Sequence, residues 1–426
     1  MNVLVVSYYI PYPPDTGASR CLYNQLKFLT AEGVTCHLYA TGTDEPAARA
    51  ALAPHCKTIT IVPPAKKQFL NIKLPVGGSL IDLINTYIPP EPWKLFLPDE
   101  RPPHAAIESI VLSEKIDMLW IDHCFVYPWI EKLKLPAALK TVIVEHNAEA
   151  ELMREIYMNS LNQNIMWQRS SERKFKGTLE MERRAHQAAD KVIYISSRDA
   201  GFSQASQELT VALPVIYEMP TVKKENYRSS GGRIIFTPNF GYDVNTEAFL
   251  WFYGEVFPKV ISEKPSVQLI ITGNAPEWIK EKCKENQSVI FTGFLSAEQL
   301  TQTLCDADVY ISPLLNGSGI KFKVIEALAL GLPVVATAKS LEGINVAAEH
   351  EVKVTAGSEA FAGAVLQLLS DESERRRLGT AAREKISAIH SPPHAAPLWK
   401  SELEKVAKKH GADSATTLTK QPVSTR

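Results

Sequence analysis

The chain has 426 residues, a length that suggests two domains or at most three, and its 45% hydrophobic and 22% charged residues are typical of a soluble globular protein. Its 46 basic and 47 acidic residues leave a formal net charge of -1, so the chain lacks the strong basic excess of a nucleic-acid-binding protein. No stretch approaches the roughly 18 apolar residues that a membrane-spanning helix needs, and the opening apolar run is too short for a signal peptide.

The first half of the sequence alternates between strand-like and helix-like segments. Residues 3–7 form a short apolar run that leads into a Pro/Gly-rich loop, and residues 18–32 carry leucines at a helical spacing. Gly33 is expected to end this helix, and residues 34–40 to form a second strand, which completes a βαβ unit. The continuation predicts strands at 118–122, 141–145 and 191–196, and a long charged helical stretch at 149–189.

The same alternation starts again in the second half. Strands are predicted at 233–237, 267–272, 289–292, 309–313 and 333–337, and helices at 247–261, 297–306 and 320–330. Most of these strands are nearly continuous apolar runs, which indicates parallel sheets covered by helices on both faces. The sequence therefore predicts an α/β fold of two doubly wound units, with a boundary in the proline-bearing stretch 214–230.

The cysteines predict no metal site, and two further regions of the chain have an unusual composition. No two cysteines have a CxxC spacing, so we expect reduced thiols in a cytosolic protein and no zinc site. Residues 69–103 carry many prolines, and they are interpreted either as a surface connection packed on the first domain or as an acceptor- or membrane-facing surface. Residues 410–426 are rich in Thr, Ser and Ala and are predicted to be disordered.

The segment most informative about function begins where a predicted strand ends at Pro313. A glycine-bearing loop follows at 317–319, and a helix is expected to start near Ile320. Glycines let a backbone approach a ligand closely, and a helix N-terminus favours an anion, so this is a candidate diphosphate site. Lys321 and Lys323 lie in the expected first turn, where cations oppose the helix dipole unless an anion is bound there.

Glu326 lies on the same predicted helix and offers a carboxylate to a ribose diol. A plain turn before a helix also fits these residues. The G-x-G-x-x-G dinucleotide fingerprint lacks its third glycine here, because Phe322 stands at that position.

The stretch from Glu326 to Thr337, EALALGLPVVAT, resembles the donor-binding motif of the family-4 retaining glycosyltransferases. Shorter segments resemble other parts of that family: the first loop up to Gly17, the EHNAE segment at 145–149, and the strand lead-ins at 189–193 and 307–310. This resemblance implies the GT-B fold, in which two facing Rossmann-like domains enclose an interdomain cleft.

The resemblance also implies a division of the chain and a set of site residues. It implies an acceptor-binding domain at 1–213, a nucleotide-sugar-binding domain at 214–385, and a helix at 386–409 that packs back on the first domain. Catalytic roles are expected for His146, Lys323 and Glu326. The expected donor-binding residues are Gly17, Asn239, Gly273, Phe294, Ser318, Gly319, Ile320, Lys321, Lys323, Glu326 and Thr337.

Two departures from the family pattern bear on the donor. Ser318 stands where many members have the first of two glutamates, which leaves the sugar preference open. The loop at 238–245 has neither the Arg nor the Lys with which many members hold the diphosphate. We therefore expect Lys321 or Lys323, with the latter favoured, to supply the missing positive charge.

Other candidate residues keep two interpretations. His146 and His123 each follow a predicted strand, where ligands bind in such sheets, and each is either a cleft residue or a structural histidine. Asp306 and Asp308 spell the D-x-D of metal-dependent transferases, but they precede a buried strand and are interpreted as structural. The loop at 342–343 either offers amides to the donor or is a plain turn.

The sequence and the resemblance together predict a retaining glycosyltransferase that uses a UDP- or GDP-sugar, without a metal or other cofactor. The expected acceptor is a glycan, a lipid-linked molecule or a small molecule, and no nucleic-acid partner is expected. Polysaccharide biosynthesis and a cytoplasmic location are expected, with peripheral contact to the inner face of the membrane left open. The alternatives are a sugar-nucleotide epimerase on the same fold and a non-catalytic binding protein.

Overall fold

The computed structural model describes residues 1–63, 104–225, 227 and 232–408, and these residues divide into two compact units. The first unit contains residues 1–194 and 202–213 and the chain from Ala396 onward, and the second contains residues 195–201 and 214–395. The interpretations of residues 69–103 and 410–426 lie outside the described residues. Residues 195–201, assigned to the N-terminal domain from the sequence, group with the second unit, as do residues 386–395.

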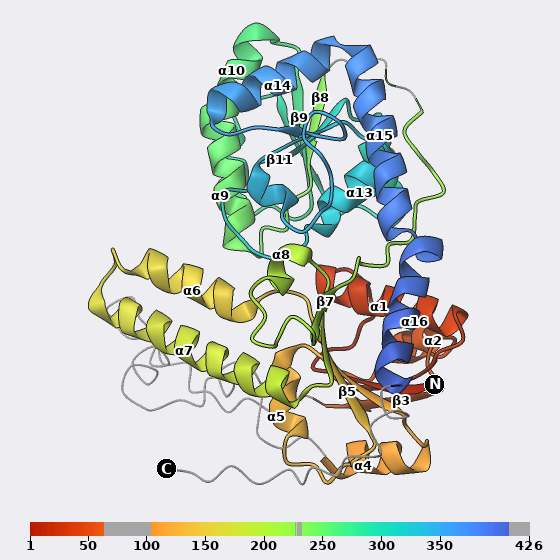
Figure 1. Ribbon diagram of the computed structural model, residues 1–426. Helices are drawn as coiled ribbons and strands as arrows, with labels where there is room; N and C mark the ends of the chain where they lie inside the picture. Colours follow the sequence, from red (N-terminus) through yellow and green to blue (C-terminus); the bar gives the residue numbers. More distant parts are fainter. Residues whose placement is uncertain (64–103, 226, 228–231, 409–426) are drawn as a thin grey trace. The chain divides into compact units, whose positions relative to one another are not determined.

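The first unit is built on a seven-stranded parallel sheet with the strand order β3-β2-β1-β4-β5-β6-β7 (Figure 1). Its strands are β1 (Asn2–Ser7), β2 (Thr35–Thr41), β3 (Thr58–Val62), β4 (Met118–Asp122), β5 (Lys140–Glu145), β6 (Lys191–Tyr194) and β7 (Thr210–Ala212). The order reverses between β1 and β4, and open parallel sheets bind ligands outside the carboxyl ends of their strands at such a point.

Helices of the first unit cover both faces of this sheet (Figure 1). They are α1 (Gly17–Ala31), α2 (Pro46–Leu52), α4 (His104–Ser113), α5 (Tyr127–Ile130), α6 (Glu149–Ser160), α7 (Ile165–Ala188) and most of α16 (Pro392–Lys408). Trp399 of α16 stacks on Trp120 of β4, with ring centroids 5.4 Å apart, and both side chains are buried. This aromatic stack holds the last described helix against the first sheet.

The second unit repeats the same architecture with the strand order β10-β9-β8-β11-β12-β13. Its strands are β8 (Arg233–Phe236), β9 (Gln268–Thr272), β10 (Val289–Gly293), β11 (Val309–Ser312), β12 (Val334–Ala336) and β13 (Lys353–Val354). All of its strand pairs are parallel, so their carboxyl ends share one edge, and the order reverses between β8 and β11. The two doubly wound units confirm the predicted α/β class.

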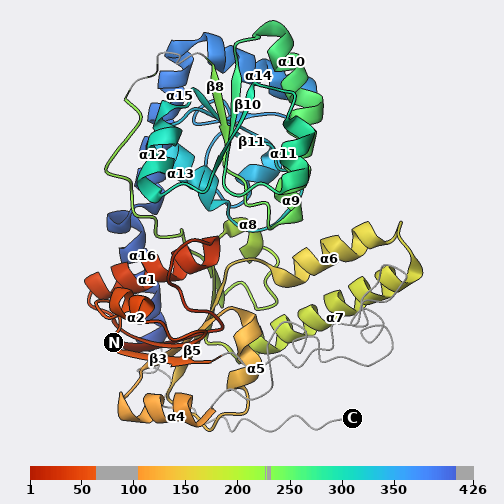
Figure 2. The same cartoon turned by 180° about the vertical axis from the view of Figure 1, so that it is seen from behind.

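Helices also lie on both faces of the second sheet (Figure 2). They are α8 (Ser197–Ala200), α9 (Asp243–Trp251), α10 (Phe257–Glu263), α11 (Glu277–Cys283), α12 (Ala297–Asp306), α13 (Phe322–Leu330), α14 (Ser358–Ser370) and α15 (Glu372–His390). Figure 2 shows α12, α13 and α15 on one side of the strands and α9, α10 and α11 on the other. The strand residues Ile234 and Ile311 belong to one buried cluster with Phe249 of α9 and Phe361 of α14.

Two long helices expected from the sequence are interrupted. The helical stretch at 149–189 is the hairpin of α6 and α7, because Asn164 caps a new helix by accepting a hydrogen bond from the Trp167 amide. The helix at 247–261 is divided by a π-helical turn at Phe252–Val256, just before Pro258, which lacks the amide that a continuous helix needs. The sequence did not predict β3, β7 and β13. Each of these three strands is an edge strand of its sheet.

Candidate functional site

The donor-binding residues predicted in the second half lie along one edge of the second sheet. Asn239 follows β8, Gly273 follows β9, Phe294 follows β10 and Thr337 follows β12. Ser318, Gly319, Ile320 and Lys321 form the loop between β11 and α13. Since all these strands are parallel, the loops meet at the carboxyl edge, where the strand order reverses between β8 and β11.

The loop before α13 bends through two glycines. Gly317 has a φ of 108° and Gly319 a φ of 71°, a left-handed conformation that strongly favours glycine. The helix begins at Phe322 and not near Ile320, so Lys321 is the residue that precedes it and Lys323 is in its first turn. No side chain caps this N-terminus, so its first amides have no side-chain acceptor.

The two lysines differ in their surroundings. The Lys321 ammonium donates a hydrogen bond to the Gly319 carbonyl at 2.7 Å, and burial lowers the pKa of this side chain to about 8. The Lys323 side chain is 43% exposed, and its Nζ lies 3.7 Å from a carboxylate oxygen of Glu326 one turn further along α13. The structure thus brings Lys321, Lys323 and Glu326 to the start of one helix.

Further charged residues surround Lys321, and of these the sequence singled out only the loop that contains Glu342. Glu342 lies 3.1 Å from the Lys339 ammonium and 3.4 Å from Nε of Arg198. Glu342 opposes the lowering of the Lys321 pKa, whereas Lys339 and Arg198 add to it. Arg198 lies more than a hundred residues before Lys321 in the sequence, and no local pattern there links the two.

Two of the predicted donor residues have structural partners in the second unit. The Thr337 hydroxyl donates to the Leu314 carbonyl at 2.5 Å and lies 3.0 Å from the Ser340 hydroxyl, so it ties the loops after β11 and β12 together. The Asn239 side chain accepts a hydrogen bond from the Gly241 amide at 2.9 Å, which closes a tight turn. Phe294 is 80% exposed.

Asp308 of the D-x-D sequence is hydrogen-bonded to backbone amides of its own unit. Its buried carboxylate accepts hydrogen bonds from the amides of Gly232 and Arg233, at 3.0 and 2.8 Å, and so ties its segment to the start of β8. Asp306 at the end of α12 accepts a hydrogen bond from the Gln302 side chain. These contacts agree with the structural interpretation of the motif.

The first unit has a buried polar cluster at the carboxyl ends of β4 and β5. Nε2 of His146 lies 3.0 Å from one oxygen of Asp122, and the Ser7 hydroxyl donates to the other oxygen at 3.0 Å. All three side chains are buried. Gly17, the remaining predicted donor residue, is the first residue of α1, directly after the Thr16 cap.

His123 belongs to the same cluster. Its ring nitrogens lie 3.3 Å from Glu145 and 3.1 Å from Glu149. Burial alone lowers the pKa of the His123 imidazole, but these two carboxylates outweigh burial and raise the pKa to about 9. His123 is therefore a cation in this unit near neutral pH.

Three atoms of this cluster have the spacing of metal ligands. Nδ1 of His123, the Cys124 sulfur and a carboxylate oxygen of Glu145 lie within 4.8 Å of one another. Burial raises the pKa of the Cys124 thiol well above its usual value, whereas a metal ligand must be a thiolate. The His123 ring is already paired with two carboxylates, so the group fits a protonated ion-pair network better than a metal site.

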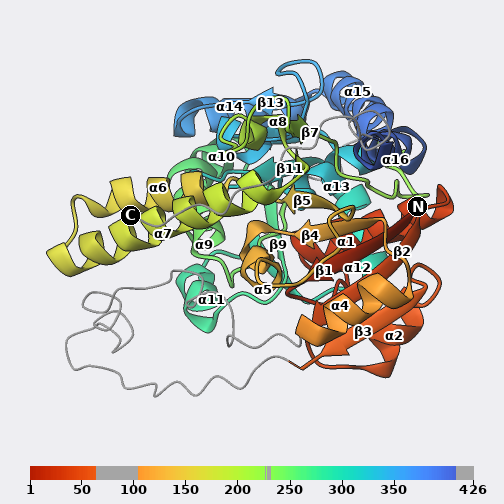
Figure 3. The ribbon, with the colours of Figure 1, turned by 60° about the horizontal axis from the view of Figure 1, so that its bottom comes forward.

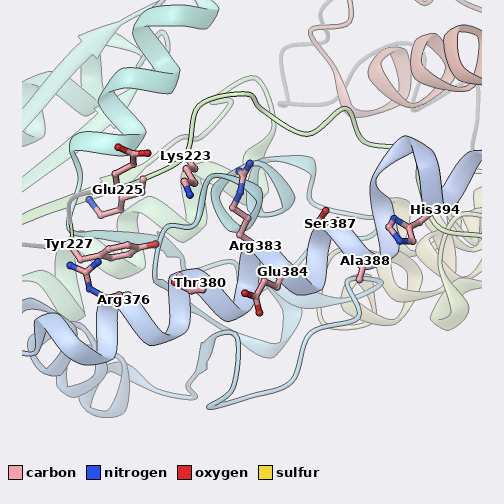
Figure 4. Close-up of a pocket in the computed structure, with 12 residues that line it drawn as sticks. Lys223, Glu225, Tyr227, Arg376, Thr380, Arg383, Glu384, Ser387, Ala388 and His394 are labelled. Atoms are coloured by element: carbon pink, nitrogen blue, oxygen red, sulfur yellow. The ribbon is translucent and has the colours of Figure 1, made fainter.

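A cavity of about 630 Å³ lies elsewhere in the second unit, between the segment before β8 and α15 (Figure 4). Lys224 beside it donates to the carbonyls of Cys305 and Ala307, which precede β11. Arg383 donates to the Ala329 carbonyl near the C-terminal end of α13. The cavity is therefore at the amino edge of the sheet, opposite the edge that carries the predicted donor residues.

Comparison with known proteins connects this geometry to a family. Residues 231–371 match the model of the family described as Glycosyl transferases group 1. An uncharacterized 44.6 kDa protein in the cps region of Klebsiella pneumoniae is 24% identical over 355 residues, which cover 80% of this chain and 84% of that protein. The sulfoquinovosyl transferase SQD2 of Arabidopsis thaliana is 25% identical over 167 residues, which cover 36% of this chain and 32% of that protein.

Solved structures of other proteins share the fold. Sucrose-phosphate synthase from Thermosynechococcus elongatus superposes with a TM-score of 0.67 at 16% identity, over 95% of this chain and 99% of that one. The HepE protein of Anabaena, in complex with UDP and glucose, superposes with a TM-score of 0.60 at 14% identity, over 94% of this chain and 99% of that one. Residues 231–371 therefore form a domain of the glycosyl transferases group 1 family, and the chain is a glycosyltransferase with the GT-B fold.

Proposed function

We propose that the chain transfers a sugar from a UDP- or GDP-sugar to a glycan, lipid-linked or small-molecule acceptor, with retention at the anomeric carbon and without a metal. One observation carries this proposal. At the point where the strand order of the second sheet reverses, a two-glycine loop leads into the uncapped N-terminus of α13, with Lys321 and Lys323 beside it. Amides and cations so placed suit a diphosphate.

Each residue of this group has a proposed role. The amides at the start of α13 and the ammonium of Lys323 or Lys321 stabilise the charge that develops on the leaving diphosphate, an effect worth roughly 10²–10³ in rate for one donor in other enzymes. Glu326 accepts hydrogen bonds from the ribose diol. His146 contacts the transferred sugar. The remaining donor-binding residues line the nucleotide through their backbones and side chains.

The absence of a metal requirement is proposed from these charges. At the start of α13, Lys321 and Lys323 supply the positive charge that a divalent ion supplies in metal-dependent enzymes, and Lys339 and Arg198, paired with Glu342, add to the positive charge around Lys321. UDP is the first nucleotide to test, because the solved HepE structure contains UDP. A glycan acceptor and a role in polysaccharide biosynthesis are proposed because one relative comes from a cps region.

The test measures thermal stabilisation of the full chain by UDP, GDP, ADP and TDP and their sugars, with and without EDTA. A ligand at 100 times its dissociation constant stabilises by ~2.7 kcal/mol, which is readily detected. The proposal expects a shift with one nucleotide that EDTA does not change and that Lys323→Ala and Glu326→Ala abolish. The matched control is the Lys280→Ala and Glu277→Ala pair, which removes an equally spaced ion pair from α11.

Product analysis separates the possible reactions. Release of free nucleoside diphosphate with a glycosylated acceptor supports a transferase, and the anomeric configuration of the product tests retention. Interconversion of two nucleotide sugars without release would make the chain an epimerase. If no nucleotide stabilises the chain, the assignment of the donor site is wrong.

A further inference from the structure

The α6–α7 hairpin ends in a short turn that stands away from the sheet of the first unit (Figures 1 and 3). The helices run over Glu149–Ser160 and Ile165–Ala188, and residues 161–164 connect them. All seven residues from Leu161 to Trp167 are exposed. The residues 156–167 at this free end are called the hairpin tip below.

The hairpin tip has a concentration of exposed large apolar side chains. Across the described parts of the chain, fifteen large hydrophobic side chains are exposed, and six of them lie within these twelve residues. They are Ile156, Met158, Leu161, Ile165, Met166 and Trp167, with exposed fractions between 36% and 58%. Single exposed apolar residues are common on protein surfaces, but a contiguous group at one projecting point indicates an interaction site.

The backbone of the turn is hydrogen-bonded by its own side chains. The Asn164 side chain accepts a hydrogen bond from the Trp167 amide at 2.9 Å. The Gln168 side chain donates to the carbonyls of Leu161 and Gln163, at 2.9 and 2.8 Å. These bonds hold the shape of the turn and pair three of its backbone groups within the protein, which lowers the cost of moving them into a layer poor in water.

The charges of the hairpin are arranged behind its apolar tip. Between residues 156 and 171, Arg169 is the only charged residue in the sequence. The next turn of α7 adds Arg173, Lys174, Lys176 and the acid Glu172, which pairs with Lys176 at 2.7 Å. With Glu151, Arg154 and Glu155 of α6, residues 151–176 hold five basic and three acidic residues, a net charge of +2. The Lys174 ammonium lies 5.9 Å from the centre of the Trp167 ring. Apolar residues and Trp at the end, followed by basic side chains, are complementary to the surface of an anionic bilayer.

We propose that the hairpin tip inserts into the surface layer of an anionic lipid bilayer and so attaches the first unit to a membrane peripherally. Within the described residues no helix has the length and hydrophobicity to span a bilayer, so contact through those residues is superficial. The apolar side chains enter the boundary between headgroups and acyl chains, and the basic residues of α7 lie at the level of the phosphates. This attachment is independent of the donor chemistry in the second unit.

Binding of the full chain to vesicles tests the proposal directly. Vesicles of phosphatidylcholine alone are compared with vesicles that also contain phosphatidylglycerol, by flotation at low and high salt. We expect at least about tenfold stronger partitioning to the anionic vesicles, because each basic residue near the surface adds roughly a fivefold factor, and we expect high salt to weaken it.

Variants assign the binding to the hairpin tip. The triple variant Leu161→Ser, Ile165→Ser, Trp167→Ser removes exposed side chains only, so we expect it to fold and to lower the partition coefficient by about tenfold or more. The matched control is Trp278→Ser on α11, which removes a tryptophan that is 53% exposed, and it should bind like the parent. A triple Arg169→Gln, Lys174→Gln, Lys176→Gln variant should lose the preference for anionic lipid.

Three outcomes would overturn the proposal. They are no binding to either vesicle, equal binding by the parent and the Ser triple variant, and a concentration-dependent dimer in light scattering that the Ser triple variant abolishes. The last would make the hairpin tip an interface between two copies of the chain. Nucleotide-induced thermal shifts of the same variants should be unchanged, so this proposal and the proposed function fail separately.

Discussion

Nε2 of His146 lies 3.0 Å from a carboxylate oxygen of Asp122, and the two buried side chains come from the ends of neighbouring parallel strands. The second oxygen of Asp122 accepts the Ser7 hydroxyl from the end of β1. Since the carboxylate is held from both sides, it fixes the orientation of the imidazole and which of its nitrogens carries the proton. Asp122 is thus placed to position His146 for the proposed contact with the sugar.

Replacing this carboxylate with an amide tests that relationship. We expect Asp122→Asn to lower kcat by up to about 100-fold through a misplaced or wrongly protonated imidazole. The dissociation constant for the nucleoside diphosphate should stay within about twofold of the parent value. We expect the change to affect the transition state and not the binding of the nucleotide in the ground state. Steady-state kinetics at several pH values and calorimetry on the same variant check both numbers, with Ser7→Ala as a milder control. An unchanged kcat would show that Asp122 does not position His146 for the reaction.

Lys321 should decrease the stability of the free protein. Burial lowers its pKa to about 8 from the usual 10.5, so between these values the unfolded chain binds more protons than the folded chain and stability rises with pH. Below pH 8 the full cost of the buried cation is present. Lys321→Met should therefore stabilise the chain at pH 7 by about 1–2 kcal/mol, and the gain should shrink toward pH 10.

Chemical denaturation at the two pH values measures this gain. The control is Lys323→Met, whose parent side chain is 43% exposed and whose effect should stay within about 0.5 kcal/mol. A stabilised Lys321→Met variant that also binds UDP more weakly would indicate that stability is given up for donor binding. A destabilised variant would contradict the interpretation of Lys321 as a buried cation whose partners do not fully offset its burial.

The polar cluster of the first unit should lose stability as pH rises. Burial and the Glu145 carboxylate raise the pKa of Glu182 to about 8, and the Glu145 and Glu149 carboxylates raise that of His123 to about 9. Both folded values lie above those of the unfolded chain, so stability falls as the pH rises. Protonated His123 adds stability that is lost between about pH 6.5 and 9, whereas keeping Glu182 buried costs stability that grows between about pH 4.5 and 8.

Glu182→Gln isolates one of these two effects. The glutamine keeps an oxygen for the Ala150 amide, which donates to Glu182 at 2.9 Å, and removes the charge. Thermal denaturation from pH 5 to 9 should show the variant gaining on the parent by on the order of 2 kcal/mol at the alkaline end. Glu180→Gln, at an exposed position of the same helix, should show no such trend. Parallel curves for the parent and Glu182→Gln would count against a buried, protonated Glu182.

The packing of α15 on the end of α13 depends on a glycine. A Cβ added at Gly379 would lie 2.1 Å from the Gly331 carbonyl oxygen and 2.7 Å from the Tyr227 hydroxyl. Since the first of these is backbone, the helices must separate, and Gly379→Ala should destabilise by about 1–3 kcal/mol. Gly363→Ala on the exposed face of α14 meets nothing within 4 Å and should stabilise by about 0.5–1 kcal/mol. Denaturant midpoints of the two variants should therefore move in opposite directions; a harmless Gly379→Ala would mean that the contact relaxes freely.

Local sequence was sufficient where one interaction decides the structure. The helix predicted at 297–306 is confirmed as α12, because Ser296 and Gln299 form a capping box at its start. Glycine after an apolar helix likewise marked the end of α13 at Gly331. Local sequence was insufficient at the start of α13, which was placed near Ile320. Lys321, with a φ of -88° and a ψ of 87°, is still outside the helical conformation, so the helix begins at Phe322.

The sequence by itself determined the two doubly wound units and the edge at which the predicted donor residues lie. Continuous apolar runs separated by helices produce parallel sheets, and in parallel sheets every strand ends at the same edge. Only the tertiary structure decided which side chains meet there. The pairing of His146 with Asp122, and of Glu342 with Arg198, joins residues from different strands or distant segments, whose contact depends on strand order and chain packing. Burial, which sets the pKa of Lys321, also arises only once the surrounding segments have folded together.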